Sequence, residues 1–69
     1  MQLQTVVWKE ENMYIIKEVV TGVTTQGKTI EEAVDNIKDA VELYLKEMPE
    51  IREELKSIET IGAVSVKIT

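Results

Sequence analysis

Residues 23–45, with the sequence VTTQGKTIEEAVDNIKDAVELYL, constrain the fold of this chain more than any other stretch. They are typical of a strand end, a tight turn and a capped amphipathic helix in direct succession. Gly27 can adopt the positive φ that such a turn often needs. Thr29 occupies the N-cap position and Glu32 completes a capping box, in which each side chain accepts from the other residue's N–H. We therefore expect Gly27, Thr29 and Glu32 to be structural residues.

The helix that follows this turn is predicted to span residues 30–47. Apolar residues recur from Ile30 to Met48 at spacings of three and four, so one stripe of the helix faces a core. Pro49 cannot continue the hydrogen-bond ladder, which places the helix end just before it. A shorter second helix is predicted within residues 50–59, where apolar residues again recur at helical spacing.

Segments rich in β-branched and aromatic residues predict strands before and after these helices. The predicted strands cover residues 3–8, 13–20, 23–26 and 63–68. A short polar break separates the first two, which favours an antiparallel hairpin. The last strand shows the cleanest pattern, because Val64, Val66 and Ile68 alternate with smaller or polar residues.

The predicted order is β-β-β-α-(α)-β, an α+β fold with one main helix on one face of a mainly antiparallel sheet. We expect residues 1–69 to form a single domain. The runs Val6–Trp8 and Ile15–Ile16 place apolar side chains on both faces of the sheet. Apolar area that no helix covers generally marks an interface. We therefore expect a homodimer or a higher homo-oligomer.

The composition narrows the classes of partner. The chain carries 13 acidic and 8 basic residues, for a net charge of −5, and it contains no histidine and no cysteine. This charge repels phosphate backbones, so we expect a basic protein partner and no direct binding of nucleic acid. No apolar run approaches the roughly 18 residues of a membrane span, and no signal-peptide pattern is present, so we expect a cytoplasmic protein. Metal and cofactor sites are not expected either.

The turn and helix also carry a resemblance to a known family. The residues concerned are TQGKTIEEA at 25–33, NIKDA at 36–40 and LYL at 43–45, with hairpin segments at 5–7 and 14–15. Together they resemble the HicB antitoxin family of prokaryotic toxin–antitoxin pairs. The resemblance implies a truncated ribonuclease H-like domain. It also implies a stoichiometric antitoxin, which binds a small basic toxin that cleaves messenger RNA and blocks its active site.

The chain departs from that family in two places. Members often have a segment like Pro-Glu-Leu-Pro-Gly after the second strand, where this chain has Val19–Gly22 without proline. Many members also carry a C-terminal helix-turn-helix or ribbon-helix-helix module, whereas this sequence stops at Thr69. We therefore expect no DNA-binding module here. Whether another chain supplies DNA binding, and whether this is a full antitoxin or a stand-alone relative, stays open.

Six side chains are candidates for contacting a partner: Trp8, Tyr14, Glu31, Asp35, Asp39 and Glu42. The two aromatic residues flank the first turn and are of the types common in interface hot spots, but packing in the sheet would also explain them. The four acids follow spacings of four, four and three along the main helix. This acidic stripe is either a solvated face or a docking surface for a basic partner.

The function that these observations favour is a non-catalytic antitoxin. The predicted first strand carries no acid, and without histidine or cysteine the usual groups for acid–base and nucleophilic catalysis are missing. One alternative is a metal-dependent nuclease or hydrolase on a ribonuclease H-like scaffold, which needs several carboxylates converging on divalent cations. Another is an orphan interaction scaffold with a different partner.

Overall fold

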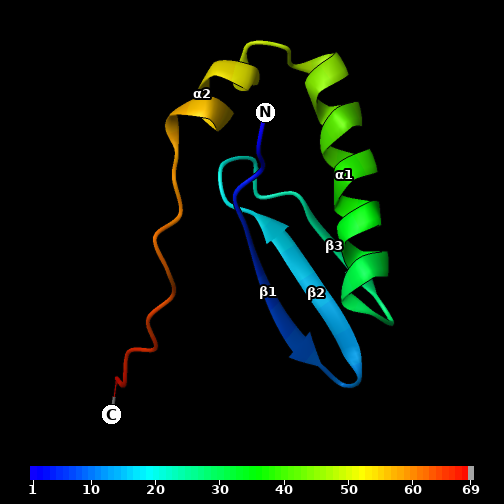
Figure 1. Ribbon diagram of the computed structural model, residues 1–69, viewed down its shortest axis with the longest axis vertical. Coiled ribbons are helices and arrows are strands. Elements are labelled where there is room, and N and C mark those ends of the chain that lie inside the picture. The colour runs from blue at the N-terminus through cyan, green and yellow to red at the C-terminus, as the bar shows by residue number, and fades with distance from the viewer. Residues whose placement is uncertain (69) are drawn as a thin grey trace.

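The N-terminal part of the chain forms one three-stranded antiparallel sheet with strand order β1-β2-β3 (Figure 1). The computed structural model describes residues 1–68. Its elements are β1 (Thr5–Glu10), β2 (Met13–Glu18), β3 (Thr24–Gly27), α1 (Ile30–Glu47) and α2 (Ile51–Ser57). The predicted α+β fold with one sheet is confirmed, and the predicted main helix has the observed bounds.

The β1–β2 hairpin turns on two residues, Glu11 and Asn12. Their φ angles are 45° and 69°, and left-handed backbone at both central positions matches the right-handed twist of the flanking strands. The turn fixes the register, in which Trp8 lies opposite Ile15. Since opposite residues share a face of the sheet, this register decides which side chains meet α1 and which do not.

The passage from β3 into α1 depends on a cap and on a close contact. The Glu32 N–H donates to Thr29 Oγ1 at 3.0 Å, so the predicted N-cap is confirmed. The return bond from the Thr29 N–H to the Glu32 carboxylate is absent from the described residues, so only half of the capping box forms. The positive φ predicted for Gly27 is also wrong. Gly27 is needed because a Cβ there would lie 2.5 Å from the Ala33 backbone nitrogen.

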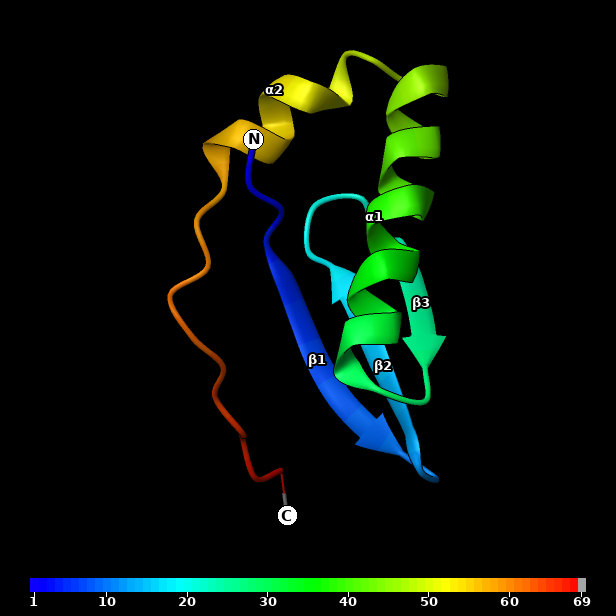
Figure 2. The ribbon, with the colours of Figure 1, turned by 45° about the vertical axis from the view of Figure 1, so that its right-hand side comes forward.

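The core lies between α1 and the two strands β2 and β3, and α1 does not cover β1 (Figure 2). The buried apolar side chains are Ile16, Ala33, Ile37, Val41, Leu45 and Leu55. α2 contributes to this core through Leu55, which is 2% exposed. Two side-chain hydrogen bonds hold β3 to α1: Thr25 Oγ1 donates to the Ala33 carbonyl at 3.1 Å, and Asn36 Nδ2 donates to the Gln26 carbonyl at 2.9 Å.

Glu18 at the end of β2 is a fully buried acid. Its carboxylate accepts from the Val20 N–H at 3.0 and 3.1 Å, and from the N–H and the hydroxyl of Thr21 at 2.6 and 2.7 Å. A buried carboxylate is tolerated only when hydrogen bonds replace the lost water. Glu18 therefore holds the turn between β2 and β3, a role that the sequence pattern did not indicate.

The predicted fourth strand at residues 63–68 is wrong for this structure. After α2 the described chain is extended and pairs with no strand (Figure 1). Its apolar side chains are almost fully exposed: Ile61 at 92%, Val64 at 87%, Val66 at 79% and Ile68 at 92%. One hydrogen bond, from the Thr60 N–H to Gln4 Oε1 at 2.9 Å, holds the start of this stretch beside the start of β1. The alternating pattern reports a preference for sheet, but a strand also needs a partner edge.

Candidate protein-interaction surface

The face of the sheet that points away from α1 carries a partly exposed apolar cluster. Because Ile16 faces α1, its neighbour Ile15 and the opposite residue Trp8 must face the other way. The cluster, called the outer patch below, consists of Val6, Trp8, Met13 and Ile15. None of the four is buried, and Trp8 is 39% exposed. The helix-free apolar face predicted from the sequence is therefore present.

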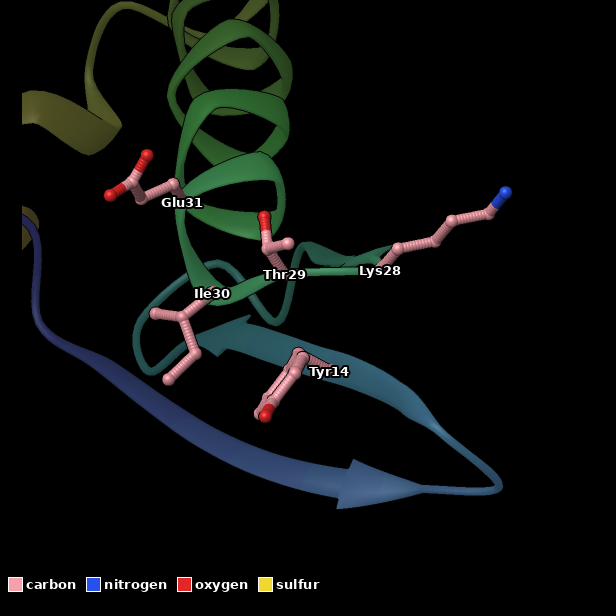
Figure 3. Close-up of a pocket in the computed structure, with 5 residues that line it drawn as sticks. All are labelled: Tyr14, Lys28, Thr29, Ile30 and Glu31. Atoms are coloured by element: carbon pink, nitrogen blue, oxygen red, sulfur yellow. The ribbon is translucent and has the colours of Figure 1, made fainter.

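A shallow hollow of about 460 Å³ lies on the other face of the sheet, at the start of α1 (Figure 3). It is lined by Tyr14, Lys28, Thr29, Ile30 and Glu31. Figure 3 shows the Ile30 side chain pointing from the start of α1 toward the hairpin, on which the Tyr14 ring lies. Ile30 is 50% exposed. The hollow exists because the first turn of α1 overhangs β2, while within residues 1–68 no helix packs over β1 beside it.

The Tyr14 ring is also held by a cation from the neighbouring strand. Lys9 lies opposite Tyr14 in the β1–β2 register, and its Nζ atom lies 5.5 Å from the ring centroid. A cation over an aromatic face is weakly attractive at an exposed site. This contact therefore favours the observed position of the amphipathic ring at the hollow only weakly.

The acidic stripe lies on the solvent-facing side of α1, and all four of its side chains are exposed. The opposite side of the helix holds the buried residues Ala33, Ile37, Val41 and Leu45. In the described part of the chain the only ion pair joins Lys56 to Glu53 at 3.7 Å, on α2. The acids on α1 therefore have no intramolecular ion-pair partner within residues 1–68, despite Lys38 and Lys46 one turn away from Glu42.

The structure divides the six predicted partner-binding residues among three places. Trp8 and Tyr14 lie on opposite faces of the sheet, since Trp8 pairs with Ile15 and Tyr14 pairs with Lys9. Tyr14 and Glu31 both line the hollow, although their side chains project in different directions (Figure 3). Glu31 also begins the acidic stripe, so the hollow and the stripe adjoin at this residue.

Trp8 is separate from this surface and belongs to the outer patch. Sequence reasoning missed Ile30 as a surface residue, because its position on the apolar stripe predicted burial. Ile30 is the first residue of α1, and this position could have indicated exposure, because the first turn of a helix can extend beyond the sheet that it covers.

Two further observations concern the described residues 1–68. No three side chains among Asp, Glu, His and Cys come together there in a group that could hold a metal ion. No helix in that range is both long and apolar enough to cross a membrane.

Comparison with known proteins places the chain in a family. Residues 2–64 match the model of a family of unknown function, DUF7387. The chain belongs to this family. A UPF0150 protein of Helicobacter pylori strain J99 is 43% identical over 49 residues, which cover 70% of this chain and 68% of that protein. A UPF0150 protein of Archaeoglobus fulgidus is 31% identical over 70 residues, which cover 99% of this chain and 96% of that protein. No solved structure matches the chain.

The DUF7387 match includes every residue of the hollow, the acidic stripe and the outer patch. Most of the exposed stretch after α2 also falls within it, up to residue 64. The relatives with UPF0150 names are prokaryotic proteins, and one of them is matched by this chain over nearly its whole length.

Proposed function

We propose that this DUF7387 protein is a non-catalytic, HicB-like antitoxin of the prokaryotic cytoplasm. It binds a small basic toxin that cleaves messenger RNA, and it covers the toxin's RNA-binding and catalytic surface. Binding is stoichiometric and needs no cofactor. The surface proposed for this contact is the hollow at the start of α1 together with the acidic stripe.

The proposal rests on two adjoining features. One is the hollow with its apolar side chains, and the other is the row of acids on α1 that form no ion pair within residues 1–68. Tyr14 and Ile30 offer an aromatic ring and a half-exposed aliphatic side chain in a concave place, which is the usual setting of an interface hot spot. The acids along α1 face solvent without an ion-pair partner in the described residues, and the chain carries a net charge of −5. Such a field attracts a basic protein and raises its association rate.

The residues that carry the resemblance to HicB antitoxins also build part of the proposed contact surface. The longest of the runs that carry this resemblance is residues 25–33, which form the end of β3, the turn at Gly27 and the capped start of α1. These same residues position Ile30 and Glu31 at the rim of the hollow. A motif that sets the direction of α1 relative to β2 thereby also shapes the proposed contact surface.

The test is reconstitution with any small basic protein whose gene adjoins the gene for this chain. We expect a complex that survives size-exclusion chromatography, and inhibition of RNA cleavage that is complete at a stoichiometric amount of this chain. Absence of both complex and inhibition would overturn the antitoxin proposal. Specific binding of magnesium or manganese by this chain in calorimetry, together with metal-dependent RNA cleavage by this chain alone, would favour the alternative of a metal-dependent hydrolase.

A charge-reversal variant tests the proposed surface. Replacing Asp35 and Asp39 with lysine should slow toxin association about tenfold or more at low salt and flatten its salt dependence. The matched control replaces Glu53 and Glu54 on α2 with lysine, which makes the same change in net charge away from α1. Equal slowing by both variants would show that the overall charge acts, and not the acidic stripe.

A further inference from the structure

The open edge of β1 and the exposed residues after α2 are complementary features of the same molecule. We propose that a second copy of this chain places its residues 61–68, called the extended segment here, as an added strand on the β1 edge. Each copy gives one segment and receives one. This self-association is independent of toxin binding, and it is measured in the absence of any other protein.

The β1 edge offers a row of unpaired backbone groups. The Val19 N–H donates to the Gln4 carbonyl at 2.8 Å, which fixes the hydrogen-bonding phase of the β1–β2 ladder. Because bonded and non-bonded pairs alternate in an antiparallel ladder, the N–H and C=O groups of Thr5, Val7 and Lys9 point away from β2. No described strand lies on that side, since the sheet order is β1-β2-β3. Such an edge accepts a further strand.

The extended segment has the composition of the strand that this edge lacks. Val64, Val66 and Ile68 alternate along it, and all three are at least 79% exposed. Four exposed large aliphatic side chains within eight residues, with Ile61 as the fourth, are unusual for a surface stretch of a folded protein. Pairing on β1 would set this apolar row on one face of the sheet, beside either Val7 at 43% or Trp8 at 39%, which β1 exposes on its two opposite faces.

The proposed occupant of the β1 edge is a second copy and not the chain's own segment. In the single chain the Thr60 N–H is already held by Gln4 beside the start of β1, and from there the segment runs along the open side of β1 (Figures 1 and 2). Even so, residues 61–68 form no described hydrogen bond with β1. Both complementary parts are free in each copy, so reciprocal exchange closes as a two-fold symmetric dimer and leaves neither part unused.

The size of the chain adds a reason for exchange. The described core contains six buried apolar residues, and domains of this length bury too little surface for a wide margin of stability. Oligomerisation is one of the usual ways in which such small domains gain burial.

Cross-linking between differently sized copies tests the exchange directly, because the chain has no cysteine of its own. A tagged copy carries Val7→Cys and an untagged copy carries Ser65→Cys. The two are refolded together and treated with a short bismaleimide. We expect the main product to join one tagged to one untagged chain. Products that join two Val7→Cys chains would show that two β1 edges pair, and would overturn the proposal.

The same cysteines placed on one chain separate exchange from pairing within a molecule. If the extended segment pairs with its own β1, the double variant yields a cross-linked monomer at every protein concentration. If copies exchange segments, it yields covalent dimers whose share rises with concentration. A cross-linked monomer as the main product at high concentration would refute the exchange.

Substitutions on the extended segment provide the second test, and they leave the core intact because their side chains are exposed. The double variant Val64→Lys, Val66→Lys should raise the dimer dissociation constant about a hundredfold in sedimentation equilibrium. The matched control is Ala63→Lys, Ser65→Lys, which adds the same charge at the same place on the opposite parity of the segment. It should raise the constant less than about tenfold. A monomeric wild-type protein at about 1 mM, or equal effects of both variants, would contradict the proposal.

Val7→Pro tests the edge itself. The Val7 N–H points away from β2, so proline there removes a donor of the open edge and no bond of the β1–β2 ladder. We expect a loss of dimer, with the helix signal in circular dichroism retained. Val7→Ala shortens the side chain but keeps the N–H, and it should weaken the dimer less. If Val7→Pro also loses helix signal, the lysine variants of the extended segment decide the outcome.

Discussion

β2 and the extended segment contain the same kinds of residue, yet β2 is largely covered and the extended segment is exposed to solvent. Each contains β-branched aliphatic side chains that suit a sheet, but Ile16 on β2 is 2% exposed whereas Ile68 is 92% exposed. β2 lies between two strands and beneath α1, while the extended segment is held at its start by one hydrogen bond. The comparison shows that strand preference is local, whereas burial depends on the covering elements that the rest of the chain supplies.

The sharpest way to break this comparison is to make the same substitution in both regions. Ile16→Ala should cost about 3 kcal/mol of unfolding free energy, because it leaves a cavity under α1. Ile68→Ala should cost less than about 0.5 kcal/mol, since its side chain contacts mainly water. Urea unfolding of dilute protein, below the concentration at which copies associate, measures both. A similar cost for the two would mean that the extended segment is packed in solution.

The same contrast explains which parts of the fold could be predicted. The helix at residues 30–47 was predicted with its observed bounds, because its cap, its apolar stripe and Pro49 are all local signals. The hairpin was also predicted from a local signal, the short polar break between two segments rich in β-branched and aromatic residues. The strand at 63–68 was predicted wrongly, because alternation cannot tell whether an edge is occupied.

The candidate site was predicted in composition but not in arrangement. The acids on α1 are exposed as the helical spacing indicated. Trp8 and Tyr14 lie on opposite faces only in the observed register of β1 and β2. The turn at Glu11 and Asn12 fixes that register. A shift of one residue exchanges the two faces of a strand, so composition alone could not decide between them.

Glu18 extends the comparison to polar side chains, because it is a buried acid in the well-packed region. Glu18→Gln should cost about 2 kcal/mol, since an amide oxygen at the Oε1 position is a weaker acceptor than a carboxylate and an NH₂ group would replace the Oε2 acceptor of the Val20 N–H. The control Glu42→Gln changes an exposed acid on α1 and should cost less than about 0.5 kcal/mol. Thermal unfolding by circular dichroism distinguishes the two. An unchanged melting temperature for Glu18→Gln would show that the buried carboxylate is dispensable.

Two glycines extend the comparison to the backbone. Gly27→Ala should cost about 2 kcal/mol, because its Cβ would lie 2.5 Å from the Ala33 nitrogen and force β3 and α1 apart. Gly62 has nothing within 4 Å of an added Cβ, so Gly62→Ala should change stability by less than about 0.5 kcal/mol. Chemical denaturation of both variants provides the measurement. If Gly27→Ala were neutral, the close approach of β3 to α1 would not be a requirement of the fold.

The smallest expected effect concerns the cap of α1, where the structure retains one half of a predicted pair. Thr29→Ala should cost about 1 kcal/mol, because it removes the acceptor of the Glu32 N–H. Glu32→Ala should cost only a few tenths of that, since the carboxylate forms no return bond to Thr29 and contributes only through the helix dipole. Thr29→Ser keeps the hydroxyl and serves as the control. Equal losses for Thr29→Ala and Glu32→Ala would mean that the full capping box forms in solution, because each side chain would then satisfy one backbone donor of the first turn.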